Sequence, residues 1–287
     1  MAIHDPTRTL SKVQQAEAQC RARLKKAKAQ VLALIKPALA TNAEYSFTID
    51  EARLLELGST IKEIVDQRMQ EDAWLFEQFV KPAYIAGTGR AYINIAAQSA
   101  AYKATAPQLA NVLMSPPYQA RIGLVRARVF EEMAGFSGDL GNKLAATLAR
   151  GVGNGFGADK VAAEIAQNFD VTEYRALRIA RTEITTALNR ARMDEADAAS
   201  AAIGLEIKLM HISAFAATSR EDHMARHGTL HTSEAQRLWW SVDANAINCL
   251  CTTIEVIIGS NGKPLAPGLI TKALQLKAKM ETTDVAN

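Results

Sequence analysis

The spacing of hydrophobic residues changes once along the chain, near Gly204. Before this glycine, apolar residues recur at helical spacing through long stretches rich in alanine. After it, residues 205–212 and 253–258 alternate between apolar and polar side chains, which is typical of strands. Aromatic residues make up only 6% of the chain, which favours close-packed helices over a β-sandwich. The sequence therefore predicts a mainly α protein, in which a multi-helix body is followed by a small C-terminal α+β module with a short-stranded sheet.

This pattern divides the chain into four segments. Residues 1–40 are predicted to form a basic N-terminal helical arm, and residues 41–203 the helical body, with a short extended piece at 45–47. Residues 204–262 are predicted to form the α+β module, and residues 263–287 a C-terminal helix and tail.

Within the body, we expect glycine, proline and capping residues to end the helices. One helix is expected from residue 51 to residue 79, followed by a flexible joint at Gly87-Thr88-Gly89. The helix that begins at Tyr118 is expected to end near Gly135, and Thr172 is expected to cap a separate helix over residues 173–202.

The charge is concentrated at the N-terminus. The whole chain carries only +3, but through residue 40 eight Lys and Arg side chains oppose Asp5 and Glu17, a net +6. These charges either form a solvated helix face that touches nothing, or meet DNA or an acidic partner by neutralising phosphates or carboxylates. No aromatic side chain is interleaved with them, so base stacking is not indicated. The candidate DNA- or partner-binding residues are Arg21, Arg23, Lys25, Lys26 and Lys28.

Cysteine content and apolar runs indicate the compartment. Three cysteines, two of them in Asn248-Cys-Leu-Cys251, do not make a disulfide framework, which favours a reducing environment. The first residues lack the charged start and apolar core of a signal peptide. No apolar run approaches the roughly 18 residues that a membrane span needs. We therefore expect a soluble protein that is made in a cytoplasm and has no membrane partner.

Histidines and cysteines gather in the last third of the chain. His223, His227 and His231 are spaced by four residues, and with Cys249 and Cys251 they could supply a tetrahedral zinc site. The alternative is a set of polar loop residues and two small buried cysteines. No His-Glu-x-x-His pattern indicates a catalytic metal, so a metal here would be structural, and no other cofactor is expected. The candidate ligands are His223, His227, Cys249 and Cys251, with His231 as a further option.

The triplet Arg181-Thr182-Glu183 lies on a predicted helix. ADP-ribosyl transfer uses an Arg and a Glu, and nucleases use carboxylates, but the sequence supplies no second acidic cluster at a metal-binding spacing. We interpret the triplet as a structural polar cluster that fixes this helix against the α+β module. No catalytic residue is predicted.

These motifs together resemble the phage Mu F-like head morphogenesis family. The resemblance rests on Ala180-Arg-Thr-Glu183, on Arg220-x-x-His223 with the glycine at 228, and on Cys249-x-Cys251 before an apolar strand. It covers about residues 115–258. It implies a minor head protein of a tailed bacteriophage, a low-copy virion component that acts near the portal in head assembly or in DNA packaging or ejection. The residues that match its structural motif are Arg181, Thr182, Glu183 and Arg220.

The resemblance also implies partners and a location. A phage portal protein and a major capsid or scaffolding protein are the expected partners, and double-stranded DNA is a further one for the basic arm. The expected location is the capsid interior or portal vertex of the virion, and the host cytoplasm during assembly. Two alternatives stay open. One is an enzyme or toxin and effector domain, for example one that transfers ADP-ribose through Arg181, Glu183 and His223; the other is a plain DNA-binding protein.

Overall fold

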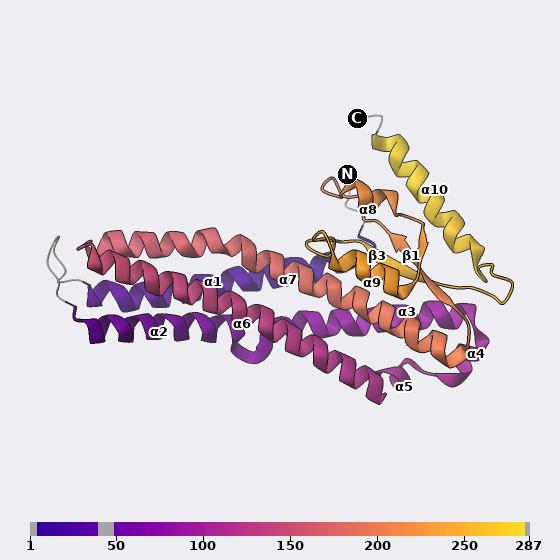
Figure 1. Ribbon diagram of the computed structural model, residues 1–287, viewed down its shortest axis with the longest axis horizontal. Helices are drawn as coiled ribbons and strands as arrows, with labels where there is room; N and C mark the ends of the chain where they lie inside the picture. The colour runs from indigo at the N-terminus through magenta and orange to yellow at the C-terminus, as the bar shows by residue number, and fades with distance from the viewer. Residues whose placement is uncertain (1–4, 40–48, 285–287) are drawn as a thin grey trace. The chain divides into compact units, whose positions relative to one another are not determined.

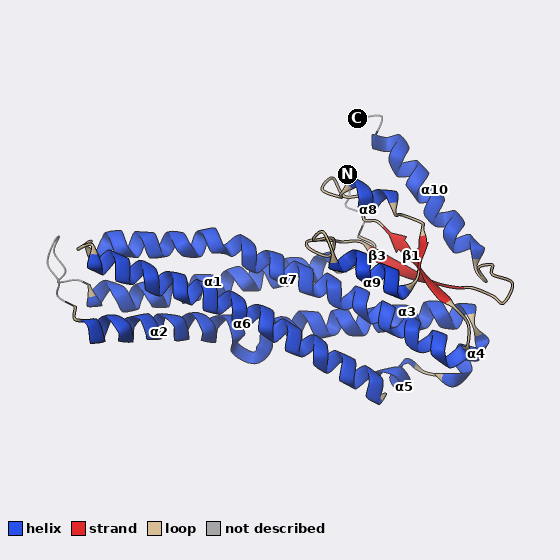
Figure 2. Ribbon diagram, in the orientation of Figure 1, coloured by secondary structure: helices blue, strands red, loops and turns tan. Residues whose placement is uncertain are grey.

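Long helices make up most of the computed structural model, which describes residues 5–39 and 49–284 (Figure 1). The helices are α1 (Leu10–Ala38), α2 (Glu51–Gln70), η1 (Glu71–Ala73), η2 (Phe76–Val80), α3 (Lys81–Gln98), α4 (Ala100–Thr105), α5 (Leu109–Leu113), α6 (Pro116–Gly153), α7 (Ala158–Ile203), α8 (Glu221–Ala225), α9 (Ser233–Ser241) and α10 (Pro267–Asp284). The strands are β1 (Ile207–Ile212), β2 (Leu230–His231) and β3 (Thr252–Ile257). The predicted fold class, mainly α with a small sheet near the C-terminus, is confirmed (Figure 2).

The chain forms two compact units that interleave along the sequence. One unit combines Val13–Gln78 with Arg126–Arg181, and the other combines Met1–Lys12, Phe79–Val125 and Thr182–Asn287. The segment boundaries expected at residues 40, 203 and 262 stay predictions, and the expected extended piece at 45–47 lies outside the described residues. None of the described helices is both long enough and apolar enough to cross a membrane.

Segments of α1, α2, α6 and α7 make up most of the described part of the first unit, which we call the bundle unit. Polar contacts tie neighbouring segments on their outer faces. Arg21 of α1 bonds Glu173 of α7 at 2.9 Å, and Arg175 of α7 bonds Asp139 of α6 at 2.7 Å. Ser137 of α6 donates to Asp66 of α2 at 2.7 Å. Between these contacts lie apolar side chains at helical spacing, and their burial is the main source of bundle stability. They include Leu24, Val31, Ile61, Met69, Leu140, Leu144, Val161 and Ile165.

The three-stranded antiparallel sheet, in the order β2-β1-β3, is the centre of the second unit, which we call the sheet unit. Successive side chains of a strand point to opposite faces, so each strand contributes to two cores. On one face, Met210, Ile212 and Val256 pack with Ala273 of α10. On the other face, Leu209 and Ile257 pack with residues of α3 and α7. The sheet therefore lies between α10 on one side and α3 and α7 on the other (Figure 2).

The outer edge of β3 is covered by side-chain amides from α3. Gln98 donates to the Glu255 carbonyl at 2.8 Å and accepts a hydrogen bond from the Ile257 amide at 3.1 Å. Asn94 donates to the same carbonyl of Glu255 at 2.7 Å. An open strand edge offers unpaired backbone groups to other chains, and these amides occupy part of that edge.

Two predicted helix ends are wrong. α6 continues through Gly135 to Gly153, and α7 continues through Thr172 to Ile203. The Thr172 hydroxyl donates to the carbonyl of Asn168 at 2.6 Å and caps no helix start. A glycine inside a helix costs about 1 kcal/mol, whereas burying one large apolar side chain contributes about 1.5–3 kcal/mol. Phe136, beside Gly135, is fully buried, so packing outweighs the local preference.

The predicted helix over residues 51–79 is also wrong in its extent. α2 ends at Gln70, and Asp72 and Ala73 turn the chain with φ of 61° and 45°. Trp74 follows this turn, is 1% exposed, and donates its indole N–H to the Met69 carbonyl at 2.9 Å. The buried indole bonds the backbone at the end of α2 and so stabilises the turn.

The predicted flexible joint at Gly87-Thr88-Gly89 is wrong as well, because α3 runs through it. A Cβ atom at Gly87 would lie 2.3 Å from the Leu188 carbonyl oxygen of α7 and 2.9 Å from the Ala191 Cβ. Gly87 therefore allows α3 to pack closely against α7, and it does not bend the chain.

We predict that Gly87→Ala lowers the free energy of unfolding by about 1–3 kcal/mol, because overpacking forces the two helices apart. Gly123→Ala in α6 is the matched control, since nothing lies within 4 Å of the added methyl group. That change should raise stability by about 0.5–1 kcal/mol. Urea unfolding followed by circular dichroism measures both, and equal effects at the two positions would contradict the packing role of Gly87.

Candidate functional site

A buried cluster of histidine and cysteine side chains lies in the sheet unit. His211, His223 and Cys251 each offer one ligand atom, and these atoms lie within 4.8 Å of one another. The Sγ atoms of Cys249 and Cys251 lie 3.4 and 3.5 Å from Nδ1 of His223. None of the four residues is more than 6% exposed.

Strand pairing explains how residues so far apart in the sequence meet. His211 on β1 lies opposite Thr253 on β3, so Cys251, which immediately precedes β3, falls near the histidine. His223 reaches the cluster from the short helix α8. The other cysteine, Cys249, lies at the end of the loop that begins at Val242. Asn248, directly before it, adopts a left-handed conformation with φ of 59°.

Neighbouring polar side chains orient both imidazoles. Nε2 of His223 lies 3.3 Å from Asn245 Oδ1, an acceptor, which leaves Nδ1 free to face the sulfur atoms. Nδ1 of His211 lies 3.4 Å from the Gln236 amide nitrogen, and its Nε2 is buried with no hydrogen-bond partner among the described residues. The Trp239 ring lies 5.1 Å from the ring of His211 and 4.6 Å from that of His223. The contact of His223 with Asn245, a ring N–H facing an oxygen acceptor, is of the kind typical of imidazoles that hold a metal.

The two thiols differ in acidity. A hydrogen bond from Cys249, helped by the neighbouring histidines, holds the pKa of the Cys251 thiol well below its usual range against the opposing effect of burial. The Cys249 pKa is raised, because its thiol gives that hydrogen bond and because it is buried. The cluster thus favours one thiolate, the form of cysteine that binds metals.

The donor set fits zinc. Cys251 Sγ and one imidazole nitrogen each of His211 and His223 converge, and Cys249 Sγ, which lies 3.4 Å from Nδ1 of His223 but outside that group of three, is the candidate fourth donor for the Cys₂His₂ combination of tetrahedral structural sites. A cavity of about 40 Å³ adjoins the cluster, lined by Arg220, His223, Cys249 and Cys251 among others. This volume admits a water molecule or a single ion, and not a substrate.

Only part of the ligand set predicted from sequence converges. His223, Cys249 and Cys251 meet, but His227 does not join them: its Nδ1 accepts from the Ser213 amide at 3.0 Å, and its Nε2 donates to the Ala273 carbonyl at 3.1 Å. His231 lies on β2, where its Nε2 bonds Thr229 at 2.7 Å. α8 ends at Ala225 and Gly228 adopts φ of 81°, so the four-residue spacing of these histidines does not become one helix face.

Sequence reasoning missed His211. The sequence did contain one indication: His211 lies in the alternating run 205–212, so its side chain is on the strand face opposite Met210 and Ile212. The register that sets it beside the cysteines became visible only with the pairing of β1 and β3.

One face of α7 holds the cysteine segment in place. Thr182 Oγ1 accepts a hydrogen bond from the Asn248 amide at 3.1 Å, and Asn189 donates to the Cys251 carbonyl at 2.9 Å. Arg192 binds the Glu255 carboxylate through two nitrogens at 2.9 and 2.7 Å. Thr182, Asn189 and Arg192 are spaced so that they share a helix face.

The other motif residues have different surroundings. Arg220 donates to the carbonyls of Ala244, Asn245 and Ile247 at 3.1–3.2 Å, which fixes the loop that carries Asn245 to His223. Glu183 is buried, with 5% exposure. Arg181 belongs to the bundle unit, where it pairs with Glu17.

The five candidate residues for DNA or partner binding are not equally available. Arg21 pairs with Glu173 at 2.9 Å, Lys28 with Asp170 at 2.8 Å, and Arg23 lies 3.7 Å from Glu71. Lys25 and Lys26 are exposed. Within the described part of the arm, acids of the bundle unit therefore neutralise three of the five charges.

Fold and site define a class: a helical protein whose small sheet carries an enclosed His/Cys cluster, clamped by a long helix. Residues 142–254 match the family described as phage Mu protein F like protein, which confirms the family prediction over this segment. The family is one of structural phage head proteins, and it implies association with the virion. No curated protein and no solved structure matches the chain.

We predict that Thr182→Val lowers the free energy of unfolding by about 0.5–1.5 kcal/mol, because the Asn248 amide loses the hydrogen bond that Thr182 Oγ1 accepts. Thr186→Val on the same helix is the control, since the Thr186 hydroxyl is buried and has no hydrogen-bond partner among the described residues. That change should be neutral or slightly stabilising. Chemical denaturation measures the free energy of unfolding of both variants, and equal losses would contradict the role of Thr182 in holding the cysteine segment.

Proposed function

We propose that the protein is a minor head protein of a tailed bacteriophage, a low-copy component that acts near the portal in head assembly or in DNA packaging or ejection. The observation that carries this proposal is the match of residues 142–254 to the Mu F-like family. That segment contains the whole His/Cys cluster and the face of α7 that clamps it.

The site geometry supports a binding and assembly role over catalysis. An enzyme that used Arg181, Glu183 and His223 would need them accessible to a substrate. Arg181 pairs with Glu17, while Glu183 and His223 are 5% and 2% exposed. The cavity beside His223 holds no more than a water molecule or an ion, which argues against the toxin and ADP-ribosyl transfer alternatives.

We propose that the cluster is a structural zinc site, with His211, His223, Cys249 and Cys251 as ligands. Bound zinc would supply folding free energy to the module, because its ligands do not form a site in the unfolded chain. Burial of all four side chains supports a structural role, since catalytic zinc needs an open coordination position.

For this site we predict about one zinc per chain by elemental analysis, consistent with one tetrahedral centre. Cys251→Ser and His211→Gln should bind far less metal and melt at a lower temperature. A chelator should lower the melting temperature of the wild type and leave that of Cys251→Ser unchanged.

The controls for the zinc prediction are His227→Gln and His231→Gln, which should keep the metal because neither side chain contacts the sulfur atoms. Wild-type protein without metal, or with a melting temperature that a chelator does not change, would make the cluster ordinary core packing. Loss of zinc in His227→Gln but not in His211→Gln would restore the ligand set predicted from sequence.

The partners proposed for the head role are the portal protein and a major capsid or scaffolding protein, with double-stranded DNA as a contact of the arm. Lys25 and Lys26 are the residues of the arm proposed to contact phosphates, because acids already neutralise Arg21, Arg23 and Lys28. Two such contacts would make any DNA binding weak and strongly dependent on salt.

Deleting the gene from its phage or prophage tests the head role. We expect cryo-electron microscopy to show misassembled, empty or non-infectious heads, restored by the wild-type protein, which should appear at low copy in the virion. Lys25→Glu with Lys26→Glu should restore assembly but not DNA content or delivery. Lys62→Glu with Lys263→Glu makes the same charge change on two other exposed lysines and should restore both. Normal infectious particles without the protein would refute the head role.

A further inference from the structure

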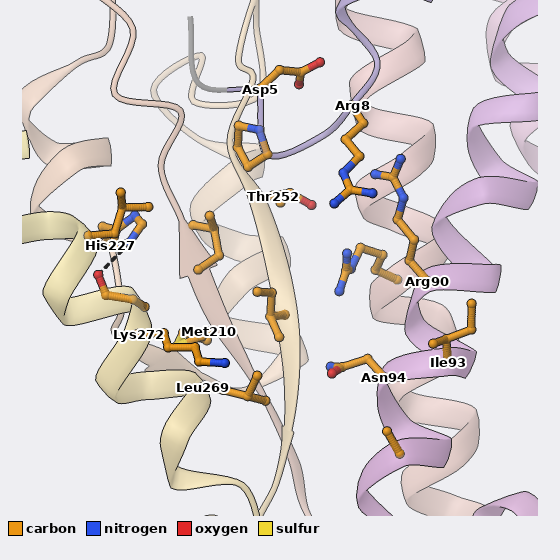
Figure 3. A pocket seen from close by; sticks show the side chains of 17 residues that line it. Asp5, Arg8, Arg90, Ile93, Asn94, Met210, His227, Thr252, Leu269 and Lys272 are labelled. Carbon is orange, nitrogen blue, oxygen red and sulfur yellow. Dashed lines mark hydrogen bonds between the residues drawn. The ribbon is translucent and has the colours of Figure 1, made fainter.

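A cavity of about 710 Å³ opens in the sheet unit, between the sheet, α3 and α10 (Figure 3). Its floor is aliphatic: Met210 and Ile254 face each other across β1 and β3, and Ile93 of α3 and Leu269 of α10 flank them. Ile93 is 65% exposed although it is large and apolar. The volume lies within the usual range of ligand sites, about 300–1,000 Å³.

One end of this cavity is cationic. Arg8 and Arg90 line it near the hydroxyl of Thr252, and Figure 3 shows these three side chains at the same end. Arg90 donates to the Thr7 carbonyl, and within the described residues neither Arg8 nor Arg90 has a carboxylate in an ion pair. Burial and the charges of Arg192 and Arg8 lower the pKa of Arg90, as expected where cations gather without enough anions.

The acids nearest to this end are already engaged. Asp5, which also lines the cavity, accepts hydrogen bonds from the Leu10 amide at 2.9 Å and from Thr7 at 2.5 Å. Glu255 is taken by Arg192. Thr252 is 2% exposed, and its buried Oγ1 has no hydrogen-bond partner among the described residues. A buried hydroxyl without a partner costs free energy, which a ligand oxygen would recover.

We propose that this cavity binds a short acidic and aliphatic segment of a partner protein. A carboxylate of the segment takes the positions facing Arg8, Arg90 and the Thr252 hydroxyl, and aliphatic side chains cover Ile93, Ile254 and Leu269. Lys272, on the α10 side, offers a second cation to the same segment.

Peptide chemistry fits both ends of the cavity, whereas a nucleic-acid phosphate fits only one. A phosphate would meet the arginines but leave the aliphatic floor in water, at a cost that scales with the uncovered apolar area. A purely apolar segment would cover the floor and leave the arginines and Thr252 unmatched. The inference does not depend on a head role, because it rests on the cavity alone.

The experiment selects partners from random dodecapeptides displayed on yeast, with the full-length protein as bait. Enriched sequences should combine Asp or Glu with Ile, Leu or Val, and a synthetic fluorescent copy of the best one is then titrated. Arg8→Gln and Thr252→Val should each weaken its binding about fivefold, the upper range for one exposed ion pair or one hydrogen bond. Changing the acidic residue of the peptide to its amide should also weaken binding about fivefold. When this peptide is titrated against Arg8→Gln, the two losses of affinity should not add, because both changes remove the same ion pair.

Three controls make the selection decisive. Lys263→Gln removes an exposed cation outside the cavity and should leave peptide binding unchanged. Thr252→Val should not lower the melting temperature, because its hydroxyl has no partner to lose. Ile93→Ser should weaken binding without unfolding the protein, since Ile93 is mostly exposed.

The proposal is overturned if no peptide is enriched, or if the enriched peptides lack acidic residues. It is also overturned if Arg8→Gln binds the peptide as tightly as Lys263→Gln does. Displacement of the peptide by a 20-base-pair DNA duplex at physiological salt would assign the cationic end to nucleic acid instead.

Discussion

The sheet unit depends on the ion pair between Arg192 and Glu255, whose side chains are 7% and 0% exposed. Removing one partner of such a pair leaves an uncompensated buried charge, which costs about 3–5 kcal/mol. Here the carboxylate is well satisfied, because Arg192 binds both of its oxygens and Asn94 adds a further hydrogen bond at 3.0 Å. The pair joins α7 to β3 at one position, and this position determines where the preceding cysteines lie.

The His/Cys cluster follows from that attachment. Asn189, one turn before Arg192, holds the Cys251 carbonyl, and Thr182 holds the Asn248 amide. Antiparallel pairing then brings His211 to the same place, while Arg220 fixes the loop whose Asn245 orients His223. These hydrogen bonds hold the loop in a small sheet unit, where few apolar side chains are available to hold it by packing alone.

The same long helix serves the two units in different ways. Up to Arg181 its polar contacts belong to the bundle unit, where Glu173 and Asp170 neutralise charges of the N-terminal arm. This pairing explains why a net +6 in the sequence is a weaker indication of DNA binding than it first suggests. Exposed ion pairs of this kind contribute about 0–1 kcal/mol each, so they reduce the available charge more than they stabilise the fold.

The sequence by itself predicted the fold class, the strands around Met210 and Ile254, the family that residues 142–254 match, and His223, Cys249 and Cys251 as possible members of one cluster. These follow from local periodicity and from short motifs whose residues lie close in sequence. Only the tertiary structure decided that Gly135 and Thr172 lie inside helices, because burial of distant side chains outweighs a local preference. Strand register placed His211 in the cluster, because a one-residue shift would move its side chain to the other face. His227 stays outside, because it bonds the Ser213 amide and the Ala273 carbonyl. The cationic cavity was also beyond the sequence, since Arg8, Arg90 and Thr252 meet only when three distant segments pack together.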